Sequence, residues 1–242
     1  MGRFSSGSCV SNTYRYWEYG LILYSYLFNP LTIASCLARP TVILSNYAIL
    51  LAISKAVQGQ TANAMIALSI ASYQSIYPVL LLPPLLLLSH DTIAKTKTTD
   101  VSLLLNHTLM FLGSLTTLLG MSYAITGGSW EFLASTYGNH LLLVDLTPNI
   151  GLWWYFFIEM FDSFREFFLG VFWLHLLSYS GGLTIRLRTQ PLFVLTTMIG
   201  LISVFIPYPS IANASLYLGL FPLYRHVFPR MYPLTLVRIR AN

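Results

Sequence analysis

The feature that most constrains this chain is its longest uninterrupted apolar stretch, residues 101–125, which contains no Asp, Glu, Lys or Arg. At ~1.5 Å per helical residue, such a stretch is long enough to cross the ~30 Å hydrocarbon core of a bilayer. Other apolar stretches precede and follow it. Soluble domains carry roughly 25% charged residues, whereas this chain of 242 residues has 9% charged and 55% hydrophobic residues. The sequence therefore predicts an all-α, polytopic transmembrane helical bundle and excludes a soluble globular domain.

Short polar or proline-containing segments separate the apolar stretches. We expect breaks at Asn29-Pro30, at Pro78 and at Pro83-Pro84, because proline removes a backbone donor and disfavours helix at the preceding residue. Residues 90–100 and 184–190 are expected to form polar loops, and residues 148–183 one long helix. A disordered segment (1–16) and a C-terminal tail (229–242) are expected to flank a membrane domain (17–228) of about 6–8 helices. The expected apolar stretches are 19–37, 41–56, 63–88, 101–125, 148–183, 191–206 and 211–224.

Basic residues predict the orientation of the chain. Two of the segments between apolar stretches contain basic residues, Lys95 and Lys97 in one and Arg186 and Arg188 in the other, and counting the stretches places both on the same side of the membrane. Residues 127–149, on the opposite side, contain no Lys or Arg. The positive-inside rule makes the first set cytosolic and places a segment at about residues 127–160 in the lumen. The 13 Lys and Arg residues against 8 acids are scattered singly. They are typical of topology determinants, so we expect contact with membrane lipid and no nucleic-acid partner.

An acidic stripe is the first candidate site. Thr147-Pro148 is a typical helix start. Asp145 and Asn149 flank it, and at about 100° per residue Tyr155, Glu159, Asp162 and Glu166 then share one face. Two alternatives remain open. The face binds amines and sugar hydroxyls of a ligand or contacts a partner, or it belongs to an interfacial helix whose acids face water.

Polar side chains within apolar stretches are further candidates. Tyr73, Gln74 and Tyr77 are expected either to join helices by hydrogen bonds or to line a pocket for a lipid head group. His107 is expected to be a buried, hydrogen-bonded histidine. The sequence has no phosphate-binding glycine loop, no metal-ligand motif, no nucleophile motif and no Asp-x-Asp pair. We therefore predict no catalytic residue, no metal site and no cofactor.

Four stretches of the chain carry a further signal. The longest is DLTPNIGLWWYFFIEMF at residues 145–161, and the others are LFNPLTIASCLA (27–38), ASYQSIYP (71–78) and a C-terminal stretch (193–228) that includes LYLGLFPLYR. In sequence and in order along the chain, these stretches resemble the phosphatidylinositol glycan class U family, whose members are subunits of the GPI transamidase. Members of the family extend further at both ends, so the resemblance implies a member truncated at both ends.

The resemblance implies a multi-pass protein of the endoplasmic reticulum membrane with a fold similar to GT-C glycosyltransferases. It implies a non-catalytic subunit that helps bind the GPI glycolipid, scaffolds the complex, or does both. Its partners would be the other transamidase subunits, including a caspase-like subunit that performs the chemistry. In this interpretation the amines and sugars of GPI are the ligand of the face that carries Glu159.

One enzymatic alternative remains open. Asn-Pro segments such as residues 27–33 also occur in GT-C mannosyltransferases, which use a dolichol-phosphate-linked sugar. An Asp-x-Asp or similar acid pair in a first luminal loop, N-terminal to this sequence, would favour that enzyme over the transamidase subunit.

Overall fold

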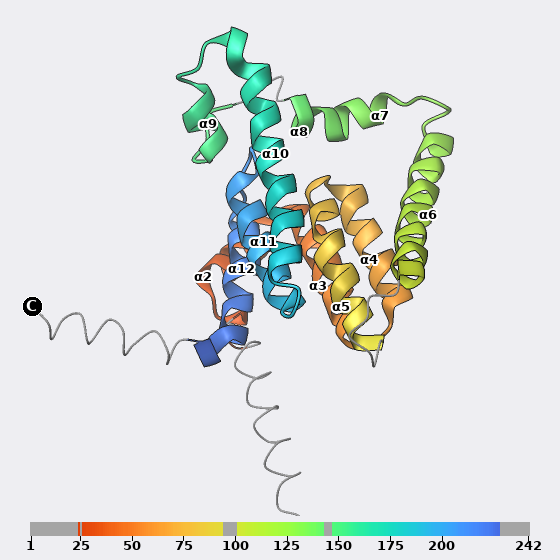
Figure 1. Cartoon of the computed structure of the whole chain (residues 1–242). Helices are drawn as coiled ribbons and strands as arrows, with labels where there is room; N and C mark the ends of the chain where they lie inside the picture. Colours follow the sequence, from red (N-terminus) through yellow and green to blue (C-terminus); the bar gives the residue numbers. More distant parts are fainter. Residues whose placement is uncertain (1–23, 25, 94–100, 143–146, 228–242) are drawn as a thin grey trace, which may run out of the picture.

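The protein is a helical bundle (Figure 1). The computed structural model describes residues 24, 26–93, 101–142 and 147–227, and within these residues it contains helices and turns but no strand. This confirms the predicted all-α class. The elements are α2 (Pro30–Ala38), α3 (Val42–Val57), α4 (Thr61–Gln74), the 3-10 helix η1 (Tyr77–Leu81), α5 (Leu82–Ile93), α6 (Val101–Ile125), α7 (Glu131–Leu133), the π-helical turn η2 (Ala134–Gly138), α8 (Asn139–Leu142), α9 (Leu152–Phe157), α10 (Asp162–Arg186), α11 (Pro191–Phe205), α12 (Ile211–Leu220) and the 3-10 helix η3 (Phe221–Val227).

The centre of the bundle is the pairing of α3 with α4. Small side chains face each other there, and Ala52 and Ala56 of α3 and Ala64 and Ala71 of α4 are all at most 1% exposed. Alanines let two helix backbones approach closely, which is how helices commonly pair when hydrophobic burial alone does not drive association. Helices α5, α11 and α12 complete the core around this pair.

Helix α6 matches the predicted stretch at both ends and lies at the edge of the bundle, beside α4 (Figure 1). Its buried side chains are His107 and Phe111. The Nε2 atom of His107 lies 2.6 Å from Oγ1 of Thr61 on α4, and Nδ1 lies 2.6 Å from the carbonyl oxygen of Leu103. This confirms the expectation that His107 is buried and hydrogen-bonded.

Among the residues that the structure describes, two helices are long and apolar enough to cross a membrane by length and composition, namely Val101–Ile125 and Ser163–Arg186. Most of their side chains are not buried against the rest of the described chain. Shorter apolar helices, such as Val42–Val57 and Pro191–Phe205, form the interior instead.

Prolines explain two confirmed boundaries and one incorrect boundary. The Asn29-Pro30 break is confirmed, since α2 begins at Pro30 and the Asn29 side chain caps it by accepting a hydrogen bond from Leu31 N at 3.0 Å. A break also occurs just before Pro78, where α4 gives way to η1. The break predicted at Pro83-Pro84 is wrong. Both residues lie in the first turn of α5, where a missing backbone N–H removes no helical hydrogen bond.

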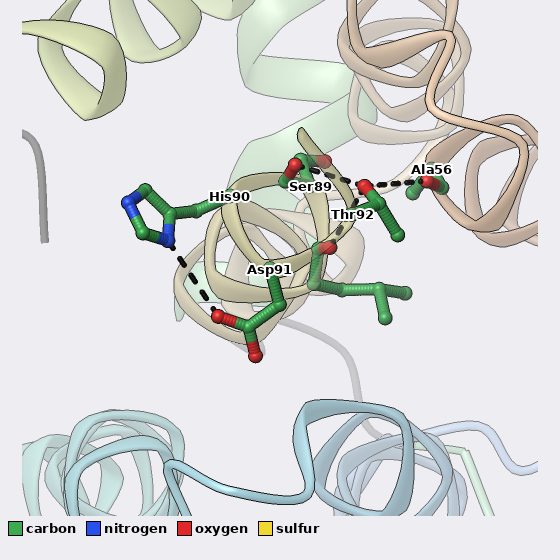
Figure 2. A network of polar contacts seen from close by, with 6 residues as sticks. Ala56, Ser89, His90, Asp91 and Thr92 are labelled. Atoms are coloured by element: carbon green, nitrogen blue, oxygen red, sulfur yellow. Dashed lines mark hydrogen bonds and ion pairs between the residues drawn. The ribbon is translucent and has the colours of Figure 1, made fainter. Parts of the chain in front are cut away.

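The polar end of α5 is helical, not a loop as predicted for residues 90–93 (Figure 2). The Thr92 hydroxyl lies 3.1 Å from the carbonyl oxygen of Ala56 at the end of α3, and within reach of two carbonyls of its own helix. His90 Nδ1 lies 3.5 Å from Asp91 Oδ1. Contacts to α3 thus extend the helix to Ile93.

The predicted loop residues Lys95 and Lys97 lie outside the described residues. The loop expected at 184–190 is also shorter, because α10 continues to Arg186.

The single helix predicted over residues 148–183 is wrong. Residues 147–151 are not helical, α9 is short, and a break at residues 158–161 separates it from α10. Aromatic packing accounts for the break. Trp153 and Phe156 of α9 contact Phe172 of α10, with ring centroids 4.7 and 5.1 Å apart. A straight helix would hold these rings far apart along its axis, so tertiary contacts override the local helical pattern.

The two ends of the bundle differ in what they carry. The elements α7, η2 and α8 run across one end, which is called the α8 end, and the last turn of α10 with Arg186 lies at the other (Figure 1).

A polar cleft at the α8 end of the bundle

A cleft of about 480 Å³ opens where several elements begin or end near α8. Its walls come from the first half of α3, the junction of α4 and η1, the end of α11, the following turn and the start of α12. The lining residues are Thr41, Val42, Leu44, Ser45, Asn46, Ile49, Gln74, Ser75, Tyr77, Pro78, His140, Ile202, Ile206, Tyr208 and Asn213.

Local chain breaks bring the polar groups of the cleft together. Helix α4 ends at Gln74 because Ser75 is extended, with φ −153° and ψ 145°, and the chain then re-enters a helix at Tyr77. At the opposite wall, Ser210 caps α12 by accepting a hydrogen bond from Ala212 N. The Asn46 side chain donates a hydrogen bond of 2.9 Å to the Ala212 carbonyl, which joins α3 to α12 beside the cleft.

Tyr77 is the most buried polar side chain of the cleft, at 1% exposure. Its ring stacks on Trp173 of α10, with centroids 5.3 Å apart and an interplanar angle of 11°. The ring of His140 meets it edge-on at 5.8 Å. Within the described part of the chain, neither the Tyr77 hydroxyl nor His140 Nδ1 has a hydrogen-bond partner. Two rings therefore fix the position of a buried hydroxyl that no described protein group satisfies.

The lining of the cleft combines apolar side chains with polar side chains that carry no formal charge. Among the described residues that line it, none is Asp, Glu, Lys or Arg. Burial lowers the pKa of His140, which favours its neutral form. The remaining polar groups are side-chain amides and hydroxyls, and each amide or hydroxyl can both donate and accept hydrogen bonds.

A chain of two tyrosines holds the segment that carries His140. The Tyr137 hydroxyl donates to the Tyr73 carbonyl at 2.5 Å, and the Tyr73 hydroxyl lies 2.5 Å from Oγ of Ser122 on α6. Burial and the neighbouring Tyr73 raise the pKa of Tyr137, so its hydroxyl stays a protonated donor at neutral pH. These two hydrogen bonds fasten η2 to α4, and α4 in turn to α6.

The predicted candidates around residue 75 separate into two groups. Gln74 and Tyr77 line the cleft. Tyr73 instead points to α6 through Ser122, which is the helix-joining role considered for it.

The acidic candidates do not meet in the cleft. Asn149 caps its own turn, its Oδ1 accepting from Gly151 N at 2.7 Å. Tyr155 on α9 and Glu159 in the break are exposed. Asp162 begins α10, and Asp145 lies outside the described residues. The break at residues 158–161 means that these residues do not form a continuous stripe on one helix, which corrects the predicted geometry.

The sequence interpretation did not include Asn46, His140 and Asn213 among the candidates. A buried asparagine inside the otherwise apolar α3 is a signal that could have been used. No local pattern marks His140, because its place depends on the contact between Tyr137 and Tyr73.

A family model described as "GPI transamidase subunit PIG-U" matches residues 5–239 of the chain. The chain belongs to this family. This confirms the resemblance drawn from the four sequence stretches. Two of those stretches, residues 71–78 and 193–228, contribute lining residues to the cleft.

Curated members of the family show similarity over most of the chain. It is 38% identical over 207 residues to the GPI-anchor transamidase component PIGU of Cricetulus griseus, covering 84% of this chain and 47% of that protein. It is 36% identical over 207 residues to the Homo sapiens PIGU component, with 84% and 47% covered. To the GPI transamidase component GAB1 of Saccharomyces cerevisiae it is 36% identical over 221 residues, with 90% and 53% covered. The chain spans about half the length of these relatives.

Proposed function

We propose that the chain acts as a non-catalytic subunit of the GPI transamidase, helping to hold the GPI glycolipid and to scaffold the other subunits. These partners include the caspase-like subunit that performs the chemistry. The observation that carries the proposal is the family match over residues 5–239, together with relatives named as transamidase components from mammals and yeast. The mannosyltransferase alternative gains no comparable support.

We also propose that the chain lies in the endoplasmic reticulum membrane as a multi-pass protein with a GT-C-like arrangement of helices. Two long apolar helices with mostly unburied side chains support this, because lipid covers such surfaces. The α8 end would face the lumen and Arg186 and Arg188 the cytosol, in agreement with the positive-inside rule.

Co-purification and rescue test the proposal. The tagged chain, expressed in cells that lack their own PIG-U component, should co-purify with the caspase-like subunit. A chimera in which the chain replaces the matching half of the human component should restore surface display of GPI-anchored proteins. A chimera that reaches normal abundance, binds no other subunit and restores no display would contradict the assignment.

A further inference from the structure

His175 lies at the middle of α10, on a side of the helix that the described bundle leaves exposed. The proposed membrane span runs from Ser163 to Arg186, and His175 is midway between its ends. At ~1.5 Å per residue, either end is about 17 Å away, so the imidazole lies near the centre of a ~30 Å hydrocarbon core. An ionisable side chain at this depth is costly, and such residues almost always face a partner or a water-filled cavity.

The hydrogen bond of His175 to its own helix determines what a partner must supply. Its Nδ1 atom lies 2.7 Å from the carbonyl oxygen of Val171. A carbonyl oxygen only accepts, so Nδ1 carries the proton. A second proton on Nε2 would place a formal charge in hydrocarbon, which is expensive. Nε2 is therefore an acceptor, and within the described residues no group donates to it. Whatever satisfies this nitrogen must be a hydrogen-bond donor.

The surface around His175 is shaped for a close neighbour. Ser178 and Gly182 share its face at helical spacing, and both are exposed. The Ser178 hydroxyl donates to the carbonyl oxygen of His175 at 2.8 Å, and nothing lies within 4 Å of a Cβ atom added to Gly182. On one flank the ring of Tyr179 lies beside the imidazole, with centroids 6.1 Å apart. Small side chains let helix backbones approach closely, so a second helix can bring a side chain within reach of Nε2.

The helix that covers this face has to come from another protein. Residues 1–23 and 228–242 are the longest segments outside the described chain, and charged residues such as Arg15 and Arg230 interrupt them. Neither segment contains the about 20 predominantly apolar residues of a membrane helix. A second copy paired about a two-fold axis at His175 would place two Nε2 acceptors against each other with no proton between them.

We propose that the α10 face formed by His175, Ser178 and Gly182 binds a transmembrane helix of another membrane protein, which donates a hydrogen bond to Nε2 near the centre of the bilayer. The donor is an uncharged side chain, a hydroxyl or a carboxamide. This inference rests on the proposed function, which makes the other protein a further subunit of the transamidase. It adds the surface and the side chain through which this chain holds such a subunit.

Photocrosslinking within the membrane tests the inference. A benzophenone amino acid replaces Leu174, which is 64% exposed beside His175 and already large. The full chain is expressed in cells that lack their own PIG-U component, and crosslinked peptides are identified by mass spectrometry. Crosslinks should join residue 174 to an apolar segment of another transamidase subunit.

Two substitutions of His175 separate its hydrogen bond from its bulk. His175→Leu removes the acceptor and should reduce the crosslinked fraction about three- to tenfold, the value of one hydrogen bond between membrane helices. His175→Gln keeps an acceptor at a similar distance from the backbone and should retain most of the crosslinking. Equal crosslinking by His175→Leu and the unaltered chain would overturn the inference.

Asn106→Leu is the matched control variant, because it also replaces an exposed polar side chain by leucine, on the other long apolar helix. It should leave crosslinking from residue 174 unchanged. The thermal unfolding midpoint of His175→Leu, measured on the purified chain alone, should also be unchanged, since within the described chain the imidazole bonds only to its own helix. A lower midpoint would assign His175 to the fold of the chain itself and would overturn the inference.

The identity of the crosslinked species decides the rest. Crosslinks to lipid alone, or to a second copy of the chain alone, would also overturn the inference. Co-purification of the caspase-like subunit is measured on the same samples. Intact co-purification without crosslinks from residue 174 to another subunit rejects this surface alone, whereas absence of co-purification with the unaltered chain rejects the subunit assignment.

Discussion

The indole nitrogen of Trp153 donates a hydrogen bond to the backbone carbonyl of Phe205, and so joins α9 to the end of α11. Trp153 is fully buried, and the carbonyl lies in the last turn of α11, where helical carbonyls lack a partner within the helix. Together with the packing of Trp153 and Phe156 on Phe172, this contact holds α9 away from the axis of α10. It also places α9 beside the turn that lines the cleft.

Trp153→Phe should loosen α9 without unfolding the bundle. The substitution leaves the Phe205 carbonyl without its donor, which costs about 1–3 kcal/mol. Amide exchange measured by mass spectrometry should become about 10- to 100-fold faster in peptides of α9, with peptides of α3 and α4 unaffected. The half-buried Trp154 provides the control, and Trp154→Phe should leave exchange close to normal. Equal protection of α9 in Trp153→Phe would show that the hydrogen bond does not hold it.

Gly151→Ala should destabilise the same region by steric conflict. A Cβ atom at this position would lie 2.7 Å from Asn149 Oδ1 and 2.8 Å from Pro209 Cδ. Forcing extra atoms into such a contact typically costs about 1–3 kcal/mol, so the thermal unfolding midpoint in detergent should fall. Gly170→Ala is the matched control, since nothing lies within 4 Å of its added Cβ, and its midpoint should stay or rise. Equal midpoints for the two variants would contradict the close packing at Gly151.

The contact between His107 and Thr61 should show coupling between α6 and α4. In a double-mutant cycle with His107→Leu and Thr61→Val, we expect a coupling free energy of about 0.6–1.7 kcal/mol, as found for hydrogen bonds between membrane helices. Unfolding in detergent of the two single variants, the double variant and the unaltered chain supplies the four values. Strict additivity of the two single effects would argue against the 2.6 Å contact.

Acidification should open the segment that carries His140. Burial lowers the pKa of His140 in the folded chain below its usual value of 6.5, so the opened form binds a proton more readily. The neutral imidazole therefore makes its full contribution to the stability of the closed segment above about pH 6.5, and this contribution is lost as the pH falls through the lower pKa of the folded chain. The equilibrium constant for opening rises at most tenfold per pH unit. Exchange at residues 134–142, corrected for the intrinsic pH effect, should rise between about pH 7 and pH 5.

His140→Phe should remove this pH dependence while retaining a ring beside Tyr77. Persistence of the same acid-induced opening in His140→Phe would assign it to another group.

Cysteine labelling should locate the two ends of the bundle on opposite sides of the membrane. In a chain with Cys9→Ser and Cys36→Ser, Arg188→Cys should react with an impermeant maleimide once the plasma membrane alone is permeabilised. Ala134→Cys, on the exposed surface of η2, should react only after the endoplasmic reticulum membrane is also opened. Reaction of Ala134→Cys from the cytosol would overturn the proposed orientation.

Some of the fold could be predicted from the sequence because local signals decide it. Helix α6 contains no charged residue and no proline, and its bounds are those expected from its pattern. Helix α3 begins and ends within a residue or so of the prediction for the same reason. Asn29 marks the start of α2 because its capping side chain and the following proline act within one turn.

The long helix predicted over residues 148–183 failed because distant contacts decide that region. Helical periodicity places Tyr155, Glu159 and Asp162 on one face, but the packing of Trp153 depends on a carbonyl fifty-two residues further along the chain. The cleft was found only in part for a similar reason. Gln74 and Tyr77 are visible as polar residues in an apolar stretch, whereas His140 comes from a segment whose position depends on Tyr137.

The hydrogen bonds that run from Tyr137 through Tyr73 to Ser122 connect α6, by way of α4, to the segment that carries the α8 wall of the cleft. A long membrane helix adjusts its tilt to the thickness of the surrounding bilayer. Leaning of α6 would pull on this tyrosine linkage and shift the imidazole of His140 relative to Tyr77. The thickness of the bilayer would thereby change the shape of the cleft without any effector binding there.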